Sequence, residues 1–153
     1  MKRVNFLILG IFCLLLVGCG KGGNKDTINV EDFQKASTDS GFIFLDNIGS
    51  YSDVEYVKEA KKAVLDSTVI EMIVYDNEEN AKKVQESQIK TFKTFKNTAV
   101  PENTEEGNNY YKYWMVSNGY YMVSSRISNT LVFCKTLLEN KEKVEKILKE
   151  IKY

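Results

Sequence analysis

Residues 110–135, YYKYWMVSNGYYMVSSRISNTLVFCK, decide the fold of this chain. Asn118-Gly119 separates two runs rich in aromatic and β-branched residues, and this dipeptide is the strongest short signal for a two-residue hairpin turn. It predicts that residues 110–117 and 120–126 pair as antiparallel strands. The length of the turn also fixes which residues oppose each other across the pair.

A second turn extends this pair to three strands. Ser128-Asn129 turns the chain again, and residues 130–135 return beside the second strand. Because directly opposed residues share a face of the sheet, both faces can be assigned. We expect the drier face to form the core beneath the helices. Its members are Trp114, Val116, Tyr121, Val123, Ser125, Val132 and Cys134, with Lys112 at the margin.

The opposite face is aromatic and carries the only arginine that follows Arg3. Its members are Tyr111, Tyr113, Met115, Tyr120, Met122, Ser124, Arg126, Leu131, Phe133 and Lys135. We expect this face to be partly exposed, and Tyr111, Tyr113, Tyr120 and Arg126 form its candidate binding face. Tyrosine and methionine are common at recognition surfaces, and arginine can stack on a ring or hold a carboxylate. The alternative is that tyrosine rings cover an open sheet face without any ligand.

The remaining segments predict the helices and strands around these three strands. Capping residues followed by apolar stripes predict helices at residues 29–37, 52–66, 76–95 and 140–153. Short apolar runs predict strands at residues 42–45 and 69–75, and a polar stretch predicts a loop at residues 97–109. This order favours an α+β fold, a two-layer sandwich with a mainly antiparallel sheet and helices packed on one face. The first strand–helix–strand unit allows one parallel pair.

The N-terminus has the pattern of an export signal. Lys2 and Arg3 precede an uncharged, mostly apolar run over residues 6–18, FLILGIFCLLLVG. These 13 residues are fewer than the roughly 20 that a membrane-spanning helix needs. The run therefore predicts the apolar region of a secretory signal peptide, with an uncleaved N-terminal anchor as the alternative.

The end of this run specifies the type of signal. Residues 16–19, LVGC, resemble the lipobox of bacterial lipoproteins, with leucine three residues before the cysteine and a small residue directly before it. Cys13 lacks this leucine. The resemblance implies that the Cys19 thiol receives a diacylglycerol, that cleavage follows Gly18, and that the new amino group can also be acylated. The membrane, contacted through lipid on Cys19, is then a partner, and the domain lies on the extracytoplasmic face of the cell membrane.

The chain divides into a signal peptide at residues 1–18, a lipidated cysteine and tether at residues 19–26, and one globular domain at residues 27–153. Residues 20–25 include three glycines and no apolar side chain, which predicts a flexible tether. Cys134 is the one cysteine left for the domain, so no intramolecular disulfide can form there. We expect it to be a buried, inert thiol.

Composition excludes several classes of function. Without Lys2 and Arg3, 19 basic side chains stand against 21 acidic ones, so no nucleic-acid partner is expected. The absence of histidine removes histidine-ligated zinc and nucleophile–histidine pairs, and no cofactor or metal is expected. We expect a lipid-anchored, non-enzymatic binding domain for a surface protein, a wall polymer or a small ligand. The alternative is a small carboxylate-dependent cell-wall hydrolase, since paired acids leave no local motif.

Overall fold

A computed structural model describes residues 22–97 and 100–153. The predicted signal peptide and Cys19 lie outside these residues. Within the described ranges, no helix combines the length and the apolar character needed to cross a bilayer.

Seven strands of the described chain form one antiparallel sheet, in the order β1-β2-β3-β7-β6-β5-β4. The strands are β1 (Ile43–Asp46), β2 (Val57–Leu65), β3 (Thr68–Tyr75), β4 (Asn103–Glu106), β5 (Tyr110–Ser117), β6 (Tyr120–Ile127) and β7 (Thr130–Leu137). The helices are α1 (Val30–Asp39), α2 (Glu78–Thr94) and α3 (Lys141–Glu150), with short 3-10 turns η1 (Ile48–Tyr51) and η2 (Leu138–Asn140). The chain is therefore an α+β sandwich, as predicted.

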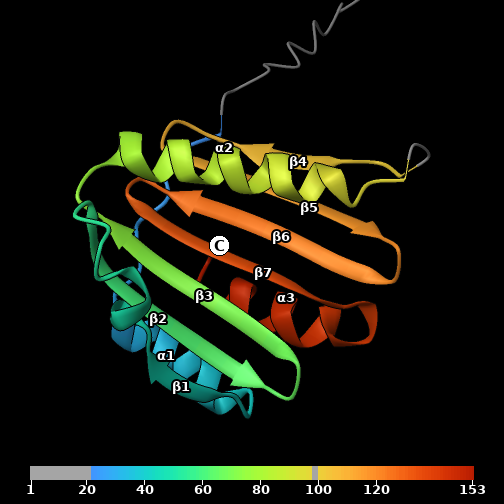
Figure 1. The fold of residues 1–153 in the computed structure, drawn as a ribbon, viewed down its shortest axis with the longest axis horizontal. Helices are drawn as coiled ribbons and strands as arrows, with labels where there is room; N and C mark the ends of the chain where they lie inside the picture. Colours follow the sequence, from blue (N-terminus) through green and yellow to red (C-terminus); the bar gives the residue numbers. More distant parts are fainter. Residues whose placement is uncertain (1–21, 98–99) are drawn as a thin grey trace, which may run out of the picture.

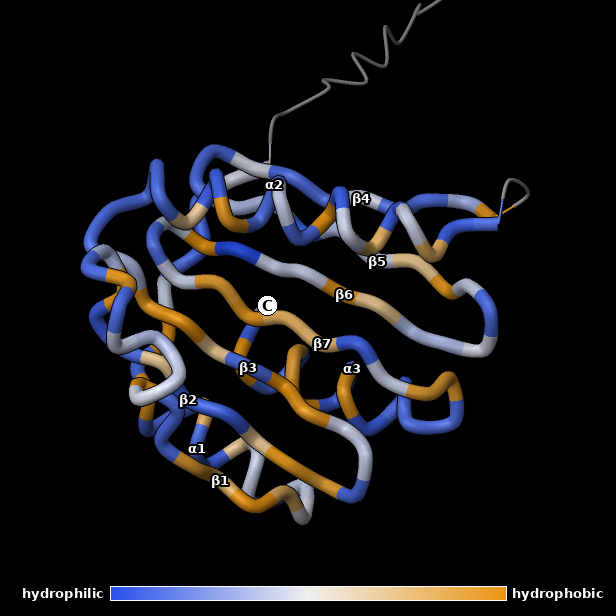
Figure 2. Tube along the Cα trace, in the orientation of Figure 1, coloured by the Kyte–Doolittle hydropathy of each residue, from blue (hydrophilic) through white to orange (hydrophobic). Residues whose placement is uncertain are grey.

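The helices cover both faces of the sheet (Figure 1). Phe33 of α1 and Val144 of α3 belong to the same core cluster as Val123 of β6, whereas Phe92 of α2 packs with Tyr113 on the opposite face. The prediction that helices pack on one face holds for α1 and α3 and is wrong for α2. The physical reason is that both faces of β5–β7 are apolar, so each needs a helix to exclude water. Figure 2 shows hydrophobic positions recurring along β3 and β7 at the centre of the sheet.

The hairpins have the predicted register. Trp114 opposes Val123, which opposes Cys134, and Arg126 opposes Leu131. Asn118 and Gly119 both have positive φ, as a type I′ turn requires. The predicted first and last helices and the strand over residues 69–75 are also confirmed, since α1, α3 and β3 form there.

The predicted helix over residues 52–66 is wrong, because this segment contains β2. A two-residue connection joins β2 to β3, with Leu65 opposite Thr68, and β2 also pairs with β1. Two neighbouring strands supply backbone partners along β2, and this pairing outweighs the local capping signal at residues 52–55. Since β1, β2 and β3 are antiparallel, the parallel pair that the sequence allowed does not form.

The predicted loop over residues 97–109 contains the edge strand β4. All four of its residues are exposed, so it has no apolar pattern that could reveal it. Its backbone pairs with β5, from Asn103 opposite Trp114 to Glu106 opposite Tyr111. Charged side chains on this edge are typical of strands that avoid pairing with other chains.

The described part of the predicted tether contacts the domain. Gly22 forms an isolated parallel bridge with Gly107, and its carbonyl accepts a hydrogen bond from the Asn108 amide. The Lys25 ammonium lies 3.0 Å from Glu105 and 4.1 Å from the centre of the Tyr110 ring. From Gly22 onward, the segment that the sequence predicts as a tether therefore contacts the domain.

Candidate functional site

The structure separates the four residues of the candidate binding face. Tyr113 and Arg126 are buried, with 1% and 5% of their surface exposed, whereas Tyr120 is 37% exposed and Tyr111 half-buried. The expectation of an open face is wrong, because α2 lies across it (Figure 1). Tyr111 and Arg126 remain together at one edge of α2.

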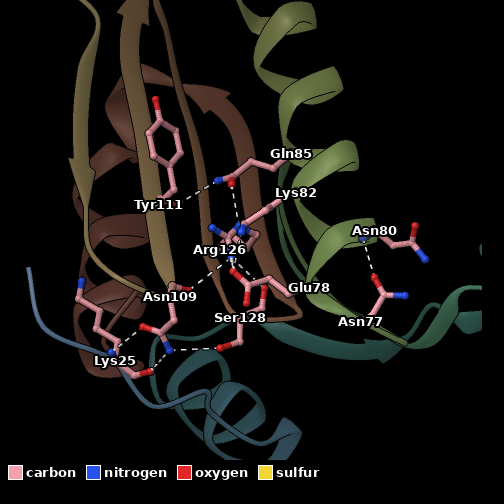
Figure 3. Close-up of polar contacts among 10 residues, drawn as sticks. All are labelled: Lys25, Asn77, Glu78, Asn80, Lys82, Gln85, Asn109, Tyr111, Arg126 and Ser128. Atoms are coloured by element: carbon pink, nitrogen blue, oxygen red, sulfur yellow. Dashed lines mark hydrogen bonds and ion pairs between the residues drawn. The ribbon is translucent and has the colours of Figure 1, made fainter. Parts of the chain in front are cut away.

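Arg126 joins α2 to the turns at one end of the sheet (Figure 3). Its Nε donates to Gln85 Oε1 at 3.3 Å, and its Nη1 donates to Glu78 Oε1 at 2.9 Å. The same Nη1 also donates to the backbone oxygens of Ser128 at 3.0 Å and Asn109 at 3.4 Å. Arg126 therefore has a structural role that the sequence did not reveal.

Glu78 is ionised by its neighbours. Burial alone raises the pKa of a carboxyl group, but hydrogen bonds and charges from Lys82 and Arg126 outweigh it, and the pKa of Glu78 lies below its ordinary value. Removal of the buried Arg126 side chain would leave Gln85 Oε1 and the Ser128 carbonyl without this donor, and an unsatisfied buried polar group costs about 1–3 kcal/mol. Arg126→Ala is thus expected to weaken the fold, and exposed residues make better probes of binding.

A groove of about 460 Å³ runs between α2 and β5, and we call it the α2 groove. Gln85, Tyr111 and Arg126 line it together with Ile89. Its charged lining residues on α2 are Lys82, Glu86, Lys90 and Lys93. With Arg126, four cations face one carboxylate, which favours an anionic ligand.

The cations of the α2 groove differ in how far they are already neutralised. Lys82 pairs with Glu78 at 3.1 Å, and Lys93 pairs with Glu102 at 2.9 Å. Lys90 is exposed and forms no ion pair within the described residues. Lys90 is therefore the one ammonium of the α2 groove without a carboxylate partner among the described residues.

The sequence alone does not distinguish the α2 lysines from those of a solvated helix surface. Lys82, Glu86, Ile89, Lys90 and Lys93 follow helical spacing, so they form one stripe beside the buried one. The sequence signal for this groove is a stripe of lysines and one isoleucine that lies next to the apolar stripe of the same helix. Only the position of α2 on the sheet shows which strand this stripe faces.

Cys134 is confirmed as a buried thiol. It is 1% exposed, and burial raises its pKa to about 12, so it stays protonated and unreactive. Within the ranges that the structure describes, no group of three cysteine, aspartate or glutamate side chains is arranged to hold a metal ion. The α2 groove presents charged side chains and apolar surface to a ligand.

Comparison with known proteins identifies no relative, since no family model, curated protein or solved structure matches this chain.

Proposed function

We propose that this chain is a lipid-anchored, extracytoplasmic, non-enzymatic domain that binds an anionic ligand in the α2 groove. The lipobox at residues 16–19 supports the anchor. The observation that carries the binding proposal is the exposed ammonium of Lys90, which has no carboxylate partner among the described residues and lines the groove together with Tyr111 and Ile89. The ligand is a small molecule, or a surface protein or wall polymer that carries such a group.

The α2 groove suits a ligand with a carboxylate or phosphate beside an apolar portion. Lys90 would donate hydrogen bonds to the anion beside the Arg126 guanidinium, which lines the same groove, and charge-assisted bonds of this kind are about twice as strong as neutral ones. Ile89 and the Tyr111 ring supply apolar surface next to these donors. Because the lysines of the groove are exposed to solvent, we expect modest affinity and strong dependence on salt.

The hydrolase alternative gains no support from this groove. Carboxylate-dependent glycoside hydrolysis needs two acids, one of them protonated at neutral pH. Glu86 is the single carboxylate among the groove's lining residues. Glu78, the nearby candidate for a second, is held ionised by Lys82 and Arg126. Binding is therefore the function that the geometry favours.

Phenyl phosphate is a suitable probe, because it combines a ring with an anionic group. The full chain, kept in a neutral detergent, is titrated with phenyl phosphate and binding is followed by ligand-observed NMR. We expect binding that Lys90→Gln weakens several-fold, because the variant removes an exposed ammonium without disturbing the core. Phenol, which lacks the charge, should bind far more weakly.

Lys83→Gln is the matched control, since Lys83 is an exposed lysine of α2 that does not line the groove. This variant should bind phenyl phosphate as the unmodified chain does. Equal affinities for Lys90→Gln and the unmodified chain would contradict the proposed site. An equal loss in both variants would show attraction by overall charge and would also contradict it.

A further inference from the structure

A second groove, of about 540 Å³, lies on the opposite face of the sheet, between β5 and the end of α3. We call it the α3 groove. Lys112 and Trp114 of β5, Lys149 of α3, and Lys152 line it, together with Lys25 from the N-terminal segment. It is separate from the α2 groove, because the sheet lies between them.

The cations of the α3 groove exceed what its own carboxylates neutralise. The two lining carboxylates, Glu105 and Glu145, pair with Lys25 at 3.0 Å and Lys141 at 3.6 Å. Lys149 and Lys152 are exposed and form no ion pair within the described residues.

Lys112 is a further cation of this groove, and it is partly buried. Its ammonium donates to the main-chain oxygen of Tyr153, the last residue of the sequence, at 3.0 Å. Burial lowers the pKa of Lys112, as expected for an ammonium group with incomplete compensation. An anion bound in the α3 groove would place a negative charge next to the Lys112 ammonium.

Lys152 occupies a backbone position that favours glycine. It has φ +63° directly after the last turn of α3, where its amide donates to the Lys149 carbonyl. The Tyr153 amide donates to the Leu148 carbonyl, which completes a Schellman motif. The side chain of Lys152 lines the α3 groove from this strained backbone position.

Trp114 is the only tryptophan of the chain and lies half-buried in this groove. The Lys112 ammonium is 5.7 Å from the centre of its ring. Tryptophan with lysine is a common pairing at the surface of a bilayer, where the ring contacts both apolar and polar groups. The groove therefore combines the two residue types that a lipid headgroup contacts.

The attached N-terminal segment keeps this groove close to the anchor. Gly22 lies three positions after Cys19, a reach of at most about 11 Å for an extended chain. Gly22 is fixed on Gly107, and Lys25 lines the groove itself. A membrane that holds lipid on Cys19 would thus lie next to the α3 groove.

We propose that the α3 groove binds the phosphate of an anionic phospholipid headgroup in the membrane that holds the anchor. This inference rests on the lipid anchor of the proposed function. Lys149 and Lys152 contact the phosphate, Lys112 supplies charge from within, and Trp114 lies against the headgroup region. The domain is then held in one orientation, with the α2 groove on the side of the sheet that faces away from the bound headgroup.

Emission from Trp114 tests the proposal directly. The full chain is placed in dodecyl maltoside micelles, which are titrated with phosphatidylglycerol, with phosphatidylcholine, or with inorganic phosphate at matched ionic strength. We expect phosphatidylglycerol alone to shift the emission to shorter wavelength. The double variant K149Q/K152Q should need at least about tenfold more phosphatidylglycerol for the same shift. K143Q/K146Q, with the same loss of charge on the same helix, should match the unmodified chain.

Three results would overturn the proposal. An equal shift with phosphatidylcholine would show apolar partitioning, and an equal shift with inorganic phosphate would show a site for the free ion. An equal effect of both double variants would show attraction by overall charge. Because micelles hold the apolar N-terminal segment whether or not Cys19 is modified, these results are separable from a failure of lipidation, which the mass of the N-terminal peptide reports.

Discussion

Asn109 and Lys25 hold each other by two reciprocal hydrogen bonds. The Lys25 amide donates to Asn109 Oδ1 at 2.9 Å, and Asn109 Nδ2 donates to the Lys25 carbonyl at 2.7 Å (Figure 3). Nδ2 also donates to the Ser128 hydroxyl at 3.1 Å, so one side chain joins the N-terminal segment to two turns of the sheet. The segment from Gly22 onward is thereby held on the domain, three positions after the proposed lipid site at Cys19.

Gly22→Ala should release this segment, because an added Cβ would lie 2.5 Å from the Tyr110 hydroxyl and 2.8 Å from the Glu106 carbonyl. Gly23→Ala is the matched control, since nothing lies within 4 Å of a Cβ there. Amide hydrogen exchange at Lys25 should become roughly tenfold faster in Gly22→Ala, as expected for a lost hydrogen bond. Equal exchange rates in the two variants would show that the segment is not held by this contact.

Tyr113→Ala should destabilise the domain more than Trp114→Ala, although the two residues are adjacent. Tyr113 is 1% exposed beneath α2, and truncation of a buried aromatic residue costs roughly 3–5 kcal/mol. Trp114 is half-buried, so its truncation should cost about half as much. Urea unfolding midpoints measure both changes. A larger loss for Trp114→Ala would mean that α2 does not cover its face of the sheet.

Lys152→Gly should stabilise the domain by roughly 0.5–1 kcal/mol, because glycine adopts positive φ without steric conflict. Lys152→Gln removes the same charge and retains the strain, so its thermal midpoint should stay near that of the unmodified chain. Equal thermal midpoints for Lys152→Gln and Lys152→Gly would show that the added stability comes from the loss of charge and not from relief of backbone strain.

Glu102 should remain ionised until the pH falls to about 2. Hydrogen bonds from Lys96 and Lys93 lower its pKa from 4.5 to about 2. A folded-state pKa below the unfolded one means that this contribution to stability is present above pH 4.5 and is lost as the pH falls through about 2. Carbon NMR of the Glu102 carboxyl should give a midpoint near 2. A midpoint near 4.5 would show that Lys93 and Lys96 do not lower the pKa of Glu102.

The elements predicted correctly from the sequence depend on neighbouring residues. Asn118-Gly119 fixes the register of its hairpin because a two-residue turn leaves no other pairing. Val144, Ile147 and Leu148 follow helical spacing, so the stripe that α3 buries can be predicted from its own sequence. By contrast, β2 depends on strands on both sides of it, and β4 has only backbone pairing, so local patterns failed for both.

The candidate site could be predicted only in part for the same reason. The register placed Tyr111 and Arg126 on one face, and they do lie together in the α2 groove. Which face α2 covers depends on the path of the chain from β3 to the edge strand β4. This path passes β7, β6 and β5. No local pattern contains this information, because both faces of β5–β7 are apolar enough to receive a helix.

Lipid on Cys19 is the central claim, since the extracytoplasmic location and the orientation at the membrane both depend on it. The most direct measurement is mass spectrometry of the chain isolated from the membranes of the cells that produce it. The account predicts a mature N-terminus at Cys19 with a diacylglyceryl group on its sulfur, and an uncleaved, unmodified precursor for Cys19→Ser. A mature N-terminus at any other residue, or an unmodified Cys19 thiol, would contradict it.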